Sequence, residues 1–286
     1  MFGRRSDGKK IKNIEPFQKI IPHIRKTRSD SQNIFTHYTD CAVLDEFIAR
    51  NREENSVSIS YFHIIIASMV RLLAERPQIN RFVMNGRIFR RNDIQISFAV
   101  KKALRDDAVG TTIKLTFRGD ENIYEVKKAV DEAIVENATL KSNNDTDKTA
   151  KVLTNMPNVF IKMGVGLIKF LDKHGMCPKK VLKASPFHTS CFITNMKSIK
   201  TDYIYHHLYD FGTTGIFIAL GKEEMKAVAM PDGTLAPRKL VGLGIVTDER
   251  FCDGFYYANS LRKLRSYLEN PSVLEQNLDH IISDVE

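Results

Sequence analysis

One stretch, Asp248-Glu249-Arg250-Phe251-Cys252-Asp253-Gly254, places three carboxylates between two apolar segments of the chain. Residues 240–246, just before it, are apolar enough to form a central strand that leads straight into Asp248. At its other end, Asp253 followed by Gly254 is typical of a helix cap and turn. We therefore expect this stretch to connect a central strand with a helix.

Helical and strand patterns alternate along the rest of the chain. Apolar residues recur at helical spacing in residues 15–28, 42–50, 61–74, 126–135 and 159–171, and alternate with period two in residues 94–100 and 111–117. Ser60 is a cap for the helix 61–74, and Pro77 lies just beyond the end of that helix. In residues 82–89, Asn85-Gly86 lies between two apolar runs, which predicts a tight hairpin.

The order of these patterns predicts one domain, a mixed sheet covered by helices, because no internal repeat and no long linker divides the chain. Residues 1–12 are rich in Lys and Arg, and we expect them to form a basic flexible N-terminus. The single domain then spans residues 13–286. Residues 142–147 are polar and predict a connection.

The composition and the apolar runs of the sequence indicate in which compartment the protein is located. A chain of 286 residues, 43% of them hydrophobic, can bury a substantial core. A membrane span needs about 20 apolar residues, whereas the apolar run 61–70 is short and ends at Arg71. The N-terminal residues lack the apolar region of a signal peptide. The four cysteines are scattered, without C-x-x-C spacing, so we expect no metal site and a reducing cytoplasmic location. Because no apolar run is long enough for a span, we also expect no membrane partner.

The opening stretch closely resembles the D-H-R-x-x-D-G signature of dihydrolipoamide acyltransferase catalytic domains from 2-oxo acid dehydrogenase complexes. It also resembles the H-x-x-x-D-G signature of chloramphenicol acetyltransferases, which share that fold. Further segments resemble the same family in the same order: an apolar helix and turn (61–80), a hairpin and strand (82–100), a "T-I-S-N" strand end (192–195), an "A-I-L-A-V-G" strand (215–221) and a last helix (255–271). The resemblance covers most of the chain. It implies a chloramphenicol acetyltransferase-like α/β fold that forms a homotrimer, with the active site between neighbouring subunits.

This resemblance implies roles for individual residues. In the family, a histidine takes a proton from the attacking thiol or hydroxyl, and here Glu249 occupies its position. Thr194 matches the family's serine, whose hydroxyl assists the reaction. Asp253 matches an acidic residue that holds an arginine, for which we expect Arg28 as the partner and Arg25 as the next candidate.

Whether Glu249 acts as the base is open at this point. Burial and the nearby carboxylates of Asp248 and Asp253 would strengthen it as a base, and on an extended strand Arg250 would face away from it. Alternatively, the site is degenerate, as in family members that serve as structural subunits. Other candidates for the base, in the same half of the chain, are His188, His206 and His207.

The resemblance also implies coenzyme A or acyl-CoA as the substrate. The formal charge of +9 is spread over the chain, which fits a solvated basic surface or the attraction of an anion such as the coenzyme A phosphates. No nucleic-acid-binding pattern occurs, so we expect no such partner. The tripeptide Thr146-Asp147-Lys148 matches the lipoylation motif but lies between helical stretches, so we expect neither a lipoyl domain nor a bound lipoyl group.

The sequence therefore predicts a CoA-dependent acyltransferase-like protein whose usual base is replaced. The alternatives are a non-catalytic trimeric scaffold, possibly within a larger assembly, and a module that binds acyl-CoA without turnover.

Overall fold

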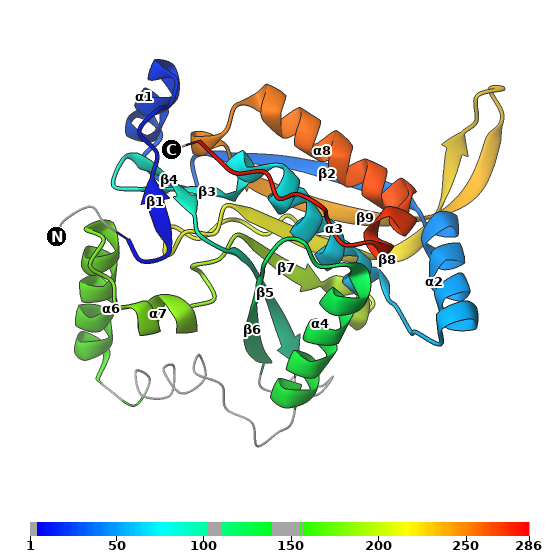
Figure 1. Ribbon diagram of the computed structural model, residues 1–286, viewed down its shortest axis with the longest axis horizontal. Coiled ribbons are helices and arrows are strands. Elements are labelled where there is room, and N and C mark those ends of the chain that lie inside the picture. Colours follow the sequence, from blue (N-terminus) through cyan, green and yellow to red (C-terminus); the bar gives the residue numbers. More distant parts are fainter. Residues whose placement is uncertain (1–4, 102–109, 139–154, 156, 286) are drawn as a thin grey trace.

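The centre of the molecule is a mixed six-stranded sheet. A computed structural model describes residues 5–101, 110–138, 155 and 157–285 (Figure 1). The strands are β2 (Gln32–Asp40), β5 (Ile94–Lys101), β6 (Gly110–Phe117), β7 (Cys191–Asn195), β8 (Ile216–Ala229) and β9 (Leu235–Asp248), in the order β2-β9-β8-β7-β5-β6. The β5–β7 and β7–β8 pairs are parallel and the others antiparallel, which confirms the predicted mixed sheet.

Strand β9 lies between β2 and β8, so the apolar run 240–246 is an internal strand, as its composition predicted. The strand is longer than that run, because its first half forms a hairpin with β8 that extends away from the body of the molecule (Figure 1). The predicted connection 142–147 and the tripeptide at 146–148 lie outside the described residues.

A smaller sheet joins the N-terminal segment to a hairpin. Its strands are β1 (Gly8–Lys10), β4 (Arg87–Arg91) and β3 (Arg81–Met84), in the order β1-β4-β3. Asn85 and Gly86 connect β3 to β4 with positive φ angles of 49° and 69°, the turn that the Asn-Gly pair predicted.

For residues 5–12, the structure differs from the expectation of a flexible N-terminus. From residue 5 onward this segment is held in place, and residues 8–10 pair with β4. The buried guanidinium of Arg5 donates to Asp7 at 2.7 Å and also forms an ion pair with Asp172. A buried cation must be neutralised, so these two carboxylates order the segment.

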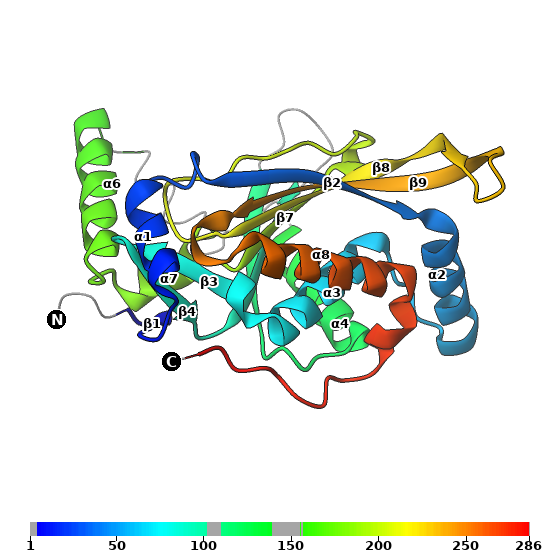
Figure 2. The ribbon, with the colours of Figure 1, turned by 90° about the horizontal axis from the view of Figure 1, so that it is seen from above.

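Helices cover one face of the sheet and lie at both ends of the molecule (Figures 1 and 2). They are α1 (Pro16–Ile24), α2 (Cys41–Asn55), α3 (Tyr61–Glu75), α4 (Ile123–Ala138), α6 (Asn158–Lys173), α7 (Lys179–Ala184) and α8 (Gly254–Glu269), with short 3-10 turns η1 (Pro77–Asn80), η2 (Met196–Ile199), η3 (Glu249–Phe251) and η4 (Pro271–Glu275). The first helix ends at Ile24, earlier than its periodicity predicted, and the chain is extended at Arg25.

Helix α3 is the centre of the core, and every residue from Tyr61 to Ala74 is buried. It begins as predicted, because Ser60 and His63 form a capping box, and it ends just before Pro77. Helices α3, α4 and α8 lie on one face of the six-stranded sheet (Figure 2).

An extended segment, residues 201–209, crosses the opposite face of the sheet. Gly242 and Gly244 of β9 allow its close approach, because a Cβ atom at Gly244 would lie 2.3 Å from the carbonyl oxygen of Ile204. At Gly242 a Cβ atom would lie 2.5 Å from the ring of Tyr203. Alternate residues of a strand point to the same face, so the two glycines together form the contact surface for this segment.

Candidate functional site

The Asp248–Gly254 stretch forms a sharp connection between β9 and α8. Asp248 ends the strand, and residues 249–251 form the turn η3. The Asp248 carboxylate accepts a hydrogen bond from the backbone N–H of Arg250 at 3.1 Å, and so it caps this turn. The predicted strand-to-helix connection is confirmed, with the addition of the 3-10 turn.

Asp248 is the centre of a buried ion cluster. Its side chain is 1% exposed and accepts two hydrogen bonds from Arg250, one from Nε at 2.9 Å and one from Nη2 at 2.7 Å. Nε of Arg28 lies 3.5 Å from the same carboxylate. Arg250 was expected to face away from Glu249 because the stretch would be extended; the stretch is instead a 3-10 turn, which brings the Arg250 guanidinium onto Asp248, while Glu249 pairs with Arg25.

Arg28 lies inside the molecule and not on its surface. It donates hydrogen bonds to the carbonyl oxygens of Tyr209 and Gly212, the latter at 2.8 Å. Burial lowers the pKa of this guanidinium, and the negative charge of Asp248 acts in the opposite direction. Asp210 accepts a hydrogen bond from the backbone N–H of Arg28 at 2.7 Å, so the loop before β8 is fixed to this arginine.

The expected pair of Arg28 with Asp253 is corrected to a pair of Arg28 with Asp248. Asp253 is the N-cap of α8, where its carboxylate accepts a hydrogen bond from the backbone N–H of Tyr256 at 2.8 Å. The helix-cap role predicted for Asp253 and Gly254 is confirmed. The difference arises because Asp248 follows directly from the buried part of β9, whereas Asp253 lies beyond the turn, at the exposed start of the helix.

Glu249 forms an ion pair with Arg25. Its side chain is 25% exposed, and its backbone N–H donates to the carbonyl oxygen of Ser31 at 3.0 Å. Arg25 was the second candidate for the arginine partner of Asp253. It instead contacts Glu249, which occupies the position of the family's base. A carboxylate that is paired with a guanidinium has fewer free lone pairs to accept a proton from a substrate.

Thr194 lies at the end of β7, far from Glu249 within one chain. Thr194 is in register with Ala219 of β8, and Ala219 is in register with Gly244 of β9. Gly244 precedes the end of β9 by four residues, so strand spacing separates Thr194 from this end of β9 by roughly 16 Å. The structure therefore does not bring Thr194 and Glu249 together within a single chain.

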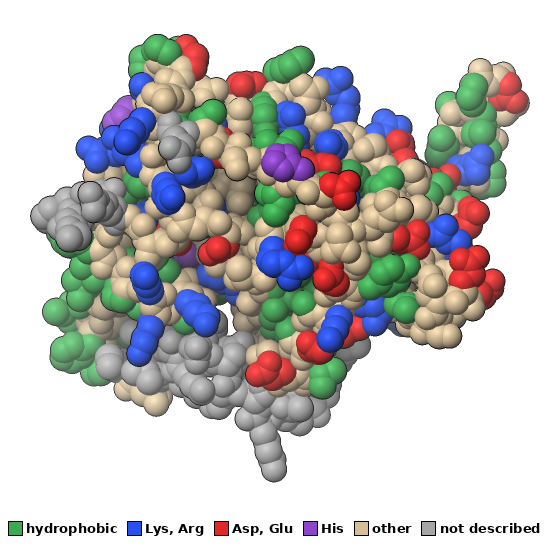
Figure 3. Space-filling model, viewed as in Figure 1, with side chains coloured by type: hydrophobic (Ala, Val, Ile, Leu, Met, Phe, Trp, Pro, Cys, Tyr) green, Lys and Arg blue, Asp and Glu red, His purple; other side chains and the backbone are tan. Residues whose placement is uncertain are grey.

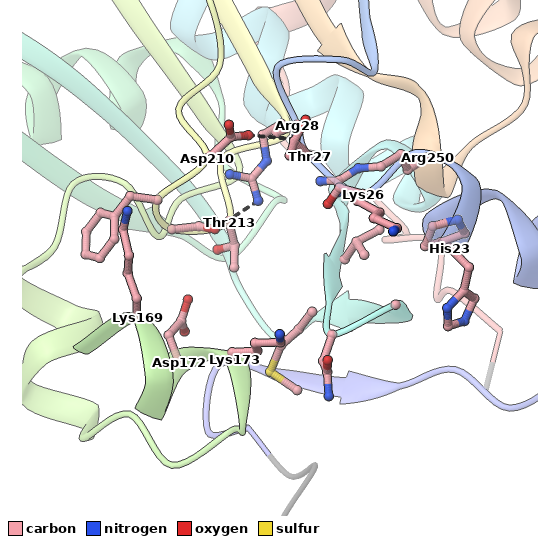
Figure 4. Close-up of a pocket in the computed structure, with 17 residues that line it drawn as sticks. His23, Lys26, Thr27, Arg28, Lys169, Asp172, Lys173, Asp210, Thr213 and Arg250 are labelled. Carbon is pink, nitrogen blue, oxygen red and sulfur yellow. Dashed lines mark hydrogen bonds between the residues drawn. The ribbon is translucent and has the colours of Figure 1, made fainter. Parts of the chain in front are cut away.

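A cationic pocket lies beside the ion cluster. Its volume is about 500 Å³, and it is enclosed by α1, the β3–β4 turn, α6 and residues 210–213 (Figure 4). Its charged lining consists of five cations and two carboxylates: Lys26, Arg28, Lys169, Lys173, Arg250, Asp172 and Asp210. Such an excess of positive charge in a concave site favours an anionic ligand. The sequence showed scattered basic residues, and only the fold reveals that these five converge.

His188 belongs to an arrangement that the sequence did not predict. Its side chain is fully buried, with Nδ1 at 2.8 Å from the hydroxyl of Ser185 and Nε2 at 3.2 Å from Asp172. Burial lowers the pKa of His188. Burial also acts to raise the pKa of Asp172, but His188 and Arg5 bring it below its ordinary value. Because the ring has no exposed surface, it connects α6 to the core instead of meeting a substrate.

Neither His206 nor His207 lines the cationic pocket, and no cysteine does. His206 stacks on Phe217 with ring centroids 4.1 Å apart and also contacts the ring of His207. All four cysteines are free and buried. In the signature itself, burial raises the pKa of the Cys252 thiol, which opposes formation of a nucleophilic thiolate.

Two expected absences concern metal and membrane. Among the described residues, no three His, Cys, Asp or Glu side chains are grouped so that they could hold a metal ion. None of the helices in the described part of the chain combines the length and apolar character needed to cross a membrane.

Comparison with solved structures identifies the fold. No family model and no curated protein matches the sequence. A probable dihydrolipoamide acetyltransferase from Listeria monocytogenes superposes with a TM-score of 0.55 at 15% identity, over 90% of this chain and 93% of that chain. The cubic core of a pyruvate dehydrogenase multienzyme complex superposes with a TM-score of 0.57 at 12% identity, over 92% of this chain and 93% of that chain. A chloramphenicol acetyltransferase superposes with a TM-score of 0.53 at 13% identity, over 91% of this chain and 99% of that chain. The chain therefore has the chloramphenicol acetyltransferase-like fold predicted from its motifs.

Proposed function

We propose that this protein is a CoA-dependent acyltransferase-type protein that acts as a homotrimer and binds acyl-CoA. The observation that carries the proposal is the combination of this fold with a cationic pocket beside the turn that follows β9. The phosphates of coenzyme A are anions, and Lys26, Lys169 and Lys173 line that pocket.

The separation of Thr194 from Glu249 supports a site that is shared between subunits. In the proposed trimer, Thr194 of one subunit faces Glu249 of the next, so that the hydroxyl and the carboxylate flank one thioester. The hydroxyl donates a hydrogen bond to the oxyanion that forms when the acceptor attacks, a contribution typically worth about 10²–10³-fold in rate. Glu249 takes the proton of the acceptor, a contribution typically worth about 10²–10⁴-fold.

In this arrangement the remaining residues of the signature position the base. Asp248, Arg250 and Arg28 form the buried cluster that fixes the turn η3, and Asp253 fixes the start of α8. Arg25 orients the Glu249 carboxylate through their ion pair. These five residues position Glu249 and the turn that carries it.

The second candidate function is a non-catalytic trimeric scaffold, or a module that binds acyl-CoA without turnover. The Arg25–Glu249 ion pair favours it, because this pair satisfies the carboxylate within the protein. Binding and chemistry are therefore tested separately.

Binding is tested first, by thermal unfolding of the purified protein with coenzyme A and with acetyl-CoA. A ligand at about 100 times its dissociation constant stabilises the native state by about 2.7 kcal/mol, which gives a clear rise in Tm. The variant Lys26→Gln should reduce this rise, whereas Lys222→Gln, on the β8–β9 hairpin, should retain it. If neither compound raises the Tm of the wild-type protein, acyl-CoA is not its ligand and the scaffold becomes the better proposal.

Chemistry is tested with Glu249→Gln, which keeps the shape of the side chain and removes its basicity. We expect acyl transfer from acetyl-CoA to a dithiol acceptor to fall about 10²-fold or more, while the Tm rise with acetyl-CoA and the oligomeric state persist. Unchanged transfer would exclude Glu249 as the base. Binding without transfer by the wild-type protein would identify a binding module.

A further inference from the structure

Helix α6 exposes an apolar stripe. Phe160, Met163, Leu167 and Phe170 are 55%, 64%, 58% and 53% exposed, and none of the residues of this helix is buried. At about 100° per residue, these four side chains lie within about one quarter of the helix circumference. The half-buried residues Ile161, Val165 and Ile168 lie on a different face, toward the rest of the molecule.

A row of lysines borders this stripe. Lys162, Lys169 and Lys173 are exposed, and the helical spacing places them together, between the stripe on one side and the half-buried Val165 on the other. Helix α7 adds three more lysines, Lys179, Lys180 and Lys183. Figure 3 shows hydrophobic side chains at the edge of the molecule occupied by α6, with Lys and Arg side chains beside them.

Negative charge is nearly absent from this part of the chain. Between residues 158 and 184 the single acidic residue is Asp172, which is engaged with Arg5 and His188. A second copy of the chain placed on the same face would therefore bring one row of lysines against another without carboxylates between them. A partner surface that matches this face must therefore carry negative charge and must also accept apolar side chains.

Helix α1 presents a second apolar face at the same end of the molecule. Phe17, Ile20 and Ile24 are 62%, 51% and 66% exposed, and their spacing places them on one side of the helix. Both α1 and α6 lie at the end that also contains β1, in each of the two views (Figures 1 and 2).

From these observations we infer that α6, with α1 beside it, docks on the surface of a bilayer that contains anionic phospholipids. The stripe enters the boundary between headgroups and acyl chains, and Lys162 and the lysines of α7 contact the lipid phosphates, whereas Lys169 and Lys173 line the pocket described above. An amphipathic helix with a basic polar face and Phe and Leu on its apolar face binds membranes in this way and needs no transmembrane span. The inference replaces the expectation, drawn from the lack of a span, that the protein has no membrane partner.

Co-sedimentation with vesicles tests this inference. We expect the wild-type protein to bind vesicles of phosphatidylcholine with phosphatidylglycerol, to bind pure phosphatidylcholine vesicles much more weakly, and to lose affinity as salt is raised. The variant Met163→Ser/Leu167→Ser should weaken binding to the anionic vesicles by more than about tenfold, because it removes two apolar side chains that the bilayer would bury.

The β8–β9 hairpin offers a matched control. Met225 and Leu235 are 66% and 72% exposed, so Met225→Ser/Leu235→Ser removes the same two side-chain types from another surface. This control should bind vesicles as the wild-type protein does. Failure of the wild-type protein to bind anionic vesicles, or equal loss in both double variants, overturns the inference. If the α6 variant retains vesicle binding but has a smaller molar mass in light scattering, a second copy occupies the stripe instead.

Discussion

Lys114 is a half-buried residue whose protonation connects stability to pH. Its ammonium group, on β6, donates hydrogen bonds to the carbonyl oxygens of Leu182, Ser185 and His188 at 2.7, 3.1 and 2.8 Å. It thereby attaches the segment after α6 to the sheet. Burial lowers the pKa of Lys114 to about 7, compared with 10.5 for a free lysine.

This lowered pKa predicts that stability rises with pH. Between about pH 7 and pH 10 the unfolded chain holds a proton on Lys114 that the folded chain tends to release, so the free energy of unfolding increases across this window. The measurement is urea unfolding at several pH values. We expect Lys114→Met to reduce the slope against pH, whereas Lys222→Met, at a more exposed position, should keep it. Equal slopes in the wild-type protein and in Lys114→Met would contradict the prediction.

At the scale of one element, strand β9 packs closely on both of its faces. Its side chains on one face fill the core, as Leu243 and Ile245 do, while Gly242 and Gly244 on the other face admit the segment 201–209. The same strand ends in Asp248, which anchors the ion cluster. The position of that segment and of the signature turn therefore depends on a single strand.

A methyl group at Gly244 should disturb this contact. In Gly244→Ala the new Cβ would lie 2.3 Å from the carbonyl oxygen of Ile204, so the segment 201–209 must shift. We expect a loss of about 1–3 kcal/mol in the free energy of unfolding, typical of overpacking. Chemical denaturation measures the loss. Gly166→Ala on α6, where no atom lies within 4 Å of the new group, should be neutral or stabilising. A Gly244→Ala protein as stable as the wild type would show that the segment does not pack closely on β9.

At the scale of the whole molecule, the face with the segment 201–209 is a candidate subunit interface. Ile34, Tyr38, Ile204 and Tyr205 are 56%, 41%, 41% and 47% exposed, and they come from the edge strand β2 and the adjoining segment. Hydroxyl contacts of Tyr38 with Tyr203 and of Thr36 with Tyr205 hold the two parts together. A subunit packed on this face would cover these apolar side chains.

We expect the protein to be a homotrimer in solution and Ile34→Asp to shift it toward monomers, because a carboxylate buried in an apolar interface is costly. Light scattering coupled to size-exclusion chromatography measures the molar mass. The variant Val135→Asp, at a position 71% exposed on α4, introduces the same charge elsewhere and should leave the trimer intact. A monomeric wild-type protein would contradict both the trimer and the proposed shared site.

Local patterns were sufficient to predict much of this molecule. The capped helix α3, the Asn-Gly hairpin, the alternating strands and the strand that ends at Asp248 each depend on residues close together in sequence. The motifs, taken in order, predicted the fold that the solved structures share.

Only the tertiary structure decided which charges meet. The pairing of Arg28 with Asp248, the ion pair of Arg25 with Glu249, the ordering of the N-terminal segment by Arg5 and the convergence of five cations in one pocket all join residues that are far apart in sequence. Spacing along the chain carries no information on such contacts, because they depend on how buried elements pack and on the need to neutralise each buried charge.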